Sequence, residues 1–175
     1  MVGHSAGGYL ALHTITTPTP IIPSNEENNE EEDGDVNEEE PSIPFTPCHV
    51  IALAPVIDLI RSWEERVSDE GDAIELFMKG KTPETHPLTY HQASIPSRLP
   101  FLSPTTIFIG SDDKDVPPHL ILEFRDCFIT DRDCDSQYPI EVIIIDEANH
   151  FTIVDPTHSH FLNDIWSTIQ PYLLT

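Results

Sequence analysis

A serine flanked by glycines stands at the start of the chain, where residues 3–7 read Gly-His-Ser-Ala-Gly. This G-x-S-x-G pattern is typical of a sharp turn between a strand and a helix that exposes the serine as a nucleophile. The glycines two places before and after Ser5 are expected to leave room for the neighbouring strand and helix. Residues 8–14 are expected to begin that helix. A chain of this length contains the pattern by chance in roughly 5% of cases, so further residues must support it.

Two later segments could complete a proton relay. Residues 110–117, GSDDKDVP, follow a predicted strand, and a carboxylate there could orient a histidine. Three aspartates compete for this role, Asp112, Asp113 and Asp115, and all three could instead be solvated turn residues. Residues 146–156, DEANHFTIVDP, follow the last predicted strand, and His150 there could take the serine proton and return it to a leaving group.

The order Ser, Asp, His, each on a loop after a predicted strand or in a strand-to-helix turn, is the chain order of one known catalytic triad. Active sites in parallel sheets lie at the carboxyl ends of the strands, where these loops would meet. The three segments together therefore predict a serine hydrolase site.

Metal or cofactor binding is not predicted. His158 and His160 could bind a metal, but no further ligand follows at a fitting spacing. The other histidines are interpreted as surface or packing residues. Cys48, Cys127 and Cys134 match no zinc pattern and cannot form a complete disulfide framework, which favours a reducing compartment such as the cytoplasm.

The elements that must position these residues alternate between strand and helix. The predicted strands are residues 49–54, 105–109 and 140–145. The predicted helices are residues 73–80, 117–129 and 161–173, and residues 81–103 are expected to be irregular, with one helical turn around Tyr90. In the last helix, one apolar face is expected from Phe161, Ile165, Trp166 and Ile169. This alternation predicts the α/β class, with a parallel sheet covered on both faces.

Charge is concentrated in one segment. The formal net charge is −23, and residues 26–40 hold ten acids and no base, so the rest of the chain carries −13. Proline-rich flanks extend the segment, and residues 16–47 are predicted to be a disordered insertion because they cannot bury enough apolar surface. The acidic surface argues against nucleic-acid binding, and no apolar run is long enough to span a membrane. An acidic tract could attract a basic partner or hold calcium, but its spacing is not that of a calcium loop.

Five segments in this order resemble the α/β-hydrolase superfamily: GHSAGGYLAL, ALAPVIDL, GDAIELFMKG, GSDDKDVPP and EANHFTIVDP. They are similar to the esterase branch that includes BD-FAE-type esterases and kynurenine formamidase, over residues 1–15 and about 48–175. The resemblance implies that Ser5 is the nucleophile and His150 the general base and acid. Asp113 matches the orienting carboxylate of the family pattern Gly-x-x-Asp-x-x-Val-Pro, and the backbone N–H of Ala6 would be one oxyanion donor.

The chain departs from this family before the elbow, the turn at Ser5. Family members have about five strands there, with a His-Gly-Gly oxyanion loop, whereas this chain has only Met1 and Val2. We therefore expect a partial α/β-hydrolase fold, the C-terminal part of a longer hydrolase, made of the elbow and the last three parallel strands. The strand that supports Ser5 is expected to be absent, and the sheet edge to be open.

The predicted function is hydrolysis of a small-molecule carboxylic ester or aryl formamide through an acyl-enzyme, without a cofactor. The isolated chain could be inactive, because loss of one oxyanion donor costs roughly 10²–10³ in rate. The alternatives are a non-catalytic hydrolase remnant, an interaction protein that uses the acidic loop, and a binding-only relative. Trp63, Phe77 and Tyr90 could line the acyl pocket, although packing roles are favoured for each.

Overall fold

Four strands form one parallel sheet in the computed structural model, which describes residues 1–16, 46–68, 70–130 and 138–173. The strands are β1 (Val2–His4), β2 (Val50–Leu53), β3 (Thr105–Gly110) and β4 (Ile140–Ile145). Their spatial order is β1-β2-β3-β4, and every neighbouring pair is parallel. The predicted α/β class is confirmed, as are the three predicted strands to within one or two residues.

A short strand does support Ser5, so the expectation that it is absent was wrong. Val2–His4 pairs in register with Ile51–Leu53. Three residues suffice because backbone bonds hold both ends: the Ile51 N–H donates to the Met1 carbonyl at 2.9 Å, and the Ser5 N–H donates to the Leu53 carbonyl at 2.9 Å. Met1 and Val2 are 43% and 47% exposed, so this edge of the sheet is open, as expected.

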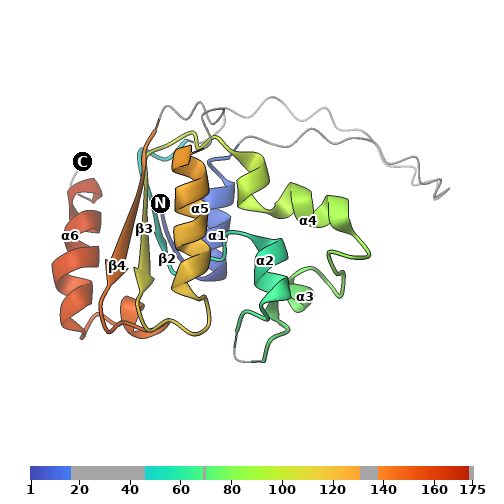
Figure 1. Cartoon of the computed structure of the whole chain (residues 1–175). Coiled ribbons are helices and arrows are strands. Elements are labelled where there is room, and N and C mark those ends of the chain that lie inside the picture. Colours follow the sequence, from blue (N-terminus) through green and yellow to red (C-terminus); the bar gives the residue numbers. More distant parts are fainter. Residues whose placement is uncertain (17–45, 69, 131–137, 174–175) are drawn as a thin grey trace, which may run out of the picture.

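Helices cover both faces of the sheet. The α-helices are α1 (Ala6–His13), α2 (Leu59–Glu64), α3 (Ala73–Phe77), α4 (Pro87–Ala93), α5 (Pro118–Thr130) and α6 (Trp166–Ile169). Shorter turns are the 3₁₀ helices Ile95–Arg98, Thr152–Val154 and Gln170–Tyr172 and the π-helix Phe161–Ile165. In Figure 1, α1 and α5 lie on one face of the sheet and α6 on the other, and α2, α3 and α4 form a group beside α1. None of the helices in the described part of the chain is long and apolar enough to span a membrane.

Several helices differ from the sequence predictions. Helix α3 ends at Phe77 rather than at residue 80, and α4 runs over seven residues where one turn around Tyr90 was expected. Helix α2 was not predicted; Asp58 caps it by accepting hydrogen bonds from the backbone N–H groups of Ile60 and Arg61. The C-terminal helix begins with a π-turn, which closes one residue later than an α-turn and rotates the following residues. Ile165 is fully buried, but Trp166 is 39% exposed, so the predicted apolar face was wrong at Trp166.

The core centres on the two middle strands. Every residue of β2 and β3 is buried, as expected for strands covered on both faces. The predicted acidic insertion lies outside the described residues except at its ends, where the prediction was wrong. Thr16 is buried and bridges to Phe101, and the Pro47 carbonyl accepts a hydrogen bond from the Ser103 hydroxyl at 2.7 Å.

Candidate active site

Ser5 occupies the turn between β1 and α1, as the glycine-flanked pattern predicts. Its backbone has φ 53° and ψ −121°, a left-handed conformation that is strained for a residue with a side chain. The bond from the Ser5 N–H to Leu53 and a 3.0 Å bond from the Tyr9 N–H to the Ser5 carbonyl hold the turn on both sides. Such a turn raises the serine hydroxyl above the end of the sheet.

Of the two glycines that flank Ser5 in the pattern, Gly3 makes room as predicted and Gly7 does not. A Cβ atom at Gly3 would lie 2.1 Å from the Gly7 carbonyl oxygen, so only glycine lets β1 pass so close to α1. A Cβ atom at Gly7 would meet nothing within 4 Å, and the prediction that Gly7 makes room was wrong. Gly8 makes that room instead, because a Cβ atom there would lie 2.9 Å from the Pro55 Cβ.

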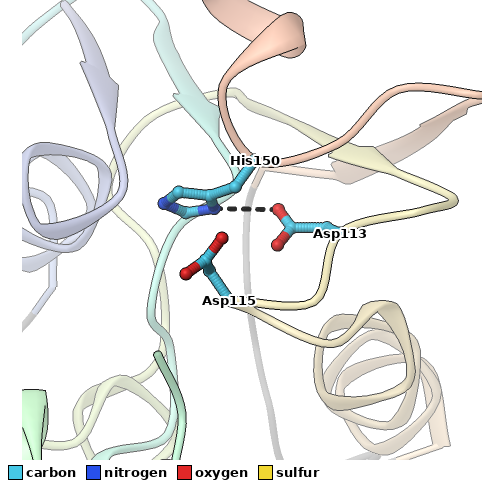
Figure 2. Close-up of side chains that lie close together, drawn as sticks. All are labelled: Asp113, Asp115 and His150. Atoms are coloured by element: carbon cyan, nitrogen blue, oxygen red, sulfur yellow. Dashed lines mark hydrogen bonds and ion pairs between the residues drawn. The ribbon is translucent and has the colours of Figure 1, made fainter. Parts of the chain in front are cut away.

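Asp113 and His150 form a buried pair. The His150 Nδ1–H donates to Asp113 Oδ2 at 2.9 Å, and the two residues are only 5% and 4% exposed (Figure 2). The other carboxylate oxygen of Asp113 accepts from the Val116 N–H at 2.8 Å, which fixes the orientation of the carboxylate. Asp112, by contrast, is exposed, and its carboxylate accepts a hydrogen bond from the Ser111 hydroxyl at 3.2 Å. The arrangement fixes the tautomer of His150 with Nε2 as the acceptor.

Backbone contacts lock together the loops that carry this pair. The Asp112 N–H donates to the Ala148 carbonyl at 3.0 Å, and the Ser111 N–H donates to the Ile145 carbonyl at 2.9 Å. A Cβ atom at Gly110 would lie 2.1 Å from the Ala148 carbonyl oxygen. The absence of a side chain at Gly110 is therefore a condition for the Asp113–His150 contact.

Ser5 and His150 face a common cavity of about 350 Å³. The remaining walls are mostly apolar: Val56, Val67, Ser68, Ala73, Ile74, Asp115, Val116 and Phe151, with His4 beside Ser5. Within the described part of the chain no hydrogen bond joins the Ser5 hydroxyl to His150. Bonds of this kind often tighten only when substrate is bound.

His4 is a site residue that the sequence analysis missed. Its Nε2–H donates to the His150 carbonyl oxygen at 2.8 Å, and the two rings lie 4.7 Å apart between centroids. Burial lowers the pKa of His4, which favours the neutral ring that makes this bond. Its position directly before the serine of the turn could have signalled a role in placing His150.

Asp115 lies close to the buried pair. Ligand atoms of Asp113, Asp115 and His150 all lie within 4.8 Å of one another, so these three residues could hold a divalent metal ion. No other group of three such residues was found in the described ranges, and His158 and His160 therefore lack a third ligand there. Their rings stack on each other, and His160 pairs with Asp164 at 3.7 Å.

A second, smaller hollow of about 100 Å³ adjoins Ser5 on the side of α1. Its walls are Ser5, Ala6, Tyr9, Val56, Leu59, Ala73, Ile74 and Phe77. Phe77 thus lines a hollow beside the serine, whereas Tyr90 is fully buried and donates to the Lys81 carbonyl, a packing role. Trp63 packs against the core with Arg66 over its ring.

Comparison with known proteins shows the fold. No family model and no curated protein matches the chain. The butyrate-bound structure of an esterase from Thermogutta terrifontis aligns with 99% of this chain and 54% of that chain, at 20% identity and a TM-score of 0.61. A puromycin-hydrolysing peptidase from Mycobacterium tuberculosis aligns with 85% of this chain and 18% of that chain, at 19% identity and a TM-score of 0.56.

A crystal structure of puromycin hydrolase gives a similar result, with 17% identity, a TM-score of 0.57, and coverage of 85% of this chain and 18% of that chain. These neighbours have the α/β-hydrolase fold. The chain spans about half the length of the esterase and a smaller share of the two puromycin hydrolases. It therefore has the architecture of part of an α/β-hydrolase domain.

Proposed function

We propose that the protein is a serine hydrolase that cleaves a carboxylic ester or an aryl formamide through an acyl-enzyme. The observation that carries the proposal is the buried Asp113–His150 pair, 2.9 Å apart, which opens onto the same cavity as Ser5 in its strained turn. A carboxylate, an imidazole and a hydroxyl in this order are the parts that acyl transfer by a serine needs.

The proposal gives each of these residues a step. Because Nδ1–H of His150 is bonded to Asp113, Nε2 is free to accept the Ser5 proton as Oγ attacks the carbonyl carbon. The N–H of Ala6 would donate to the oxygen that becomes negative in the tetrahedral intermediate. His150 then returns the proton to the departing oxygen or nitrogen, and the acyl group stays on Oγ. Water attacks the acyl-serine by the same route, which frees the acid and restores Ser5.

The substrate class is supported from two directions. The esterase to which the chain is similar favours an ester, and one structure of that esterase is phosphonylated by cyclosarin. The sequence segments that resemble kynurenine formamidase extend the proposal to aryl formamides. Since the chain spans 54% of the esterase, a second oxyanion donor could come from outside the described residues.

Labelling with a fluorophosphonate tests the proposal, because this reagent phosphonylates an activated serine. We expect a mass increase of one phosphonyl group on Ser5, located by peptide mapping. The label should be lost in Ser5→Ala and much reduced in His150→Gln. Ser97→Ala is the matched control, since Ser97 hydrogen-bonds to His91 away from the cavity, and it should label as the parent does.

An unlabelled chain whose circular dichroism spectrum shows a folded α/β protein would contradict the proposal and favour the non-catalytic remnant. Labelling of equal extent in the parent and in Ser5→Ala would also contradict it, because the reactive group would then be another residue. Turnover of aryl esters with small acyl groups should follow the same pattern across the variants.

A further inference from the structure

The two hollows that meet at Ser5 are lined differently. The smaller one has apolar walls and includes Ala6, whereas the larger one contains His150 and Asp115. Ser5, Val56, Ala73 and Ile74 line both, so a carbonyl carbon placed at the Ser5 hydroxyl would have both hollows beside it.

The proposed chemistry decides which side receives the leaving group. His150 must hand its proton to the departing atom, so the leaving group has to lie in the larger cavity, on the His150 side. The acyl chain then occupies the small apolar hollow of about 100 Å³, beside the oxyanion donor Ala6. With the substrate placed in this way, the leaving group lies next to Asp115.

The Asp115 carboxylate is free to interact with that group. Figure 2 shows it directed toward the His150 ring from the loop that also carries Asp113. Among the residues that the structure describes, none donates a hydrogen bond to the Asp115 side chain or forms an ion pair with it. The Asp115 carbonyl accepts from the Ser68 N–H at 3.0 Å, which holds the loop in place.

The surroundings strengthen the effect of this charge. Apolar walls such as Val67, Ile74 and Val116 reduce screening by water, so a unit charge acts more strongly there than at an open surface. Phe151, which is 65% exposed, lines the cavity and could offer its ring face to a cation.

We propose that Asp115 selects substrates whose leaving group carries a positive charge, such as the ester of an amino alcohol. The inference rests on the proposed function. The other charged groups nearby are Asp112, Asp113 and Lys114, which together with Asp115 line a third hollow of about 590 Å³. The charge of Asp113 is engaged by His150, and Lys114 is exposed to solvent, so the leaving-group side is negative.

A pair of esters that differ only in charge tests the proposal. The cationic member is 2-(trimethylammonio)ethyl thiobutyrate and the neutral isostere is 3,3-dimethylbutyl thiobutyrate, both followed by release of thiol. The quantity measured is the ratio of their kcat/KM values. The ratio is needed because Asp115 also lies near the positive charge that His150 acquires when it takes the serine proton. Removing the Asp115 charge should therefore slow the hydrolysis of both esters.

We expect the parent to prefer the cationic ester by about tenfold, the size expected for one charge pair at roughly 5 Å in a partly screened site. The ratio should fall to about 1–2 in Asp115→Asn and stay near the parent value in Asp112→Asn, which removes the same charge from the neighbouring hollow. Salt at 1 M should reduce the parent ratio.

The same comparison can be made without turnover, with two phosphonothioates that carry these cationic and neutral leaving groups. The quantity measured is then the ratio of their rates of reaction with Ser5. A ratio near 1 in the parent, with Ser5-dependent reaction of the neutral compound, would overturn the role of Asp115 and leave the proposed function intact. A high ratio that survives Asp115→Asn would overturn it as well. Failure of both compounds to react at Ser5 would overturn the proposed function, and this inference with it.

Discussion

Substituting Gly110 by alanine should separate the two loops that carry Asp113 and His150. The added Cβ would lie 2.1 Å from the Ala148 carbonyl oxygen and 2.6 Å from its carbon. A carbon–oxygen contact needs about 3.3 Å, so one loop must move by roughly 1.2 Å. That movement would stretch the 3.0 Å bond from the Asp112 N–H to Ala148 and the 2.9 Å bond between Asp113 and His150.

The expected cost has two parts. Overpacking at a site bounded by backbone atoms destabilises a protein by about 1–3 kcal/mol, and a 1 Å misplacement in an active site lowers the rate by about 10². Gly7→Ala is the matched control, because the new methyl group meets nothing within 4 Å and Gly7 lies inside α1. There alanine should be neutral or stabilising by up to about 1 kcal/mol.

The assay is urea unfolding followed by circular dichroism, with the labelling rate of Ser5 measured on the same samples. Gly110→Ala should unfold at lower urea and label more slowly, and Gly7→Ala should match or exceed the parent in both. The reasoning would be refuted if Gly110→Ala kept the parent midpoint and labelling rate. It would also be refuted if Gly7→Ala were the more damaging of the two.

Three further predictions concern the candidate site and the partly buried histidines. Asp113→Asn should lower turnover or labelling by roughly 10³–10⁴ while the spectrum stays that of the parent, because the amide can hold His150 in the wrong tautomer; a loss below tenfold would argue against the role of Asp113. Burial lowers the pKa of His4, His13 and His49, so the unfolded chain binds protons more readily, and stability present above about pH 6.5 should be lost as the pH falls. The urea midpoint should fall as the pH is lowered from 7.5 to 5.5, and this fall should be smaller in His4→Gln. An equal fall in the parent and in His4→Gln would contradict the prediction. Zn²⁺ should inhibit by binding Asp113, Asp115 and His150, with weaker inhibition in Asp115→Asn, whereas EDTA should leave activity unchanged.

Most strands were predicted from local sequence patterns. The strand that was missed depends on contacts between segments that are distant in the sequence. The strand around Ile107 was predicted because a buried parallel strand reads as an apolar run, and the strand around Ile143 was predicted from a similar run although β4 is only partly buried. The strand at Val2–His4 was not, because three residues show no period, and its existence depends on pairing with Ile51–Leu53, which lies 49 residues later in the sequence.

The sequence patterns contained glycines that the fold needs, but they did not show which neighbouring backbone makes each glycine necessary. Gly7 belongs to the G-x-S-x-G pattern, yet the close approach to Pro55 falls on Gly8. Gly110 was noted only as the end of a strand, although the Ala148 carbonyl makes glycine necessary there. A pattern records residues, whereas the need for glycine depends on which backbone passes nearby in space.

The three loops of the candidate site are joined to one another by different numbers of contacts. The loops of Asp113 and His150 are joined by backbone hydrogen bonds and by the buried hydrogen bond between the two side chains. The elbow of Ser5 is anchored to β2 through Leu53, and in the described part of the chain it reaches the His150 loop through the single hydrogen bond from His4. The Asp113–His150 contact is therefore held by more hydrogen bonds than the contact between the elbow and the His150 loop, for which the structure gives the His4 bond and the packing of the His4 and His150 rings.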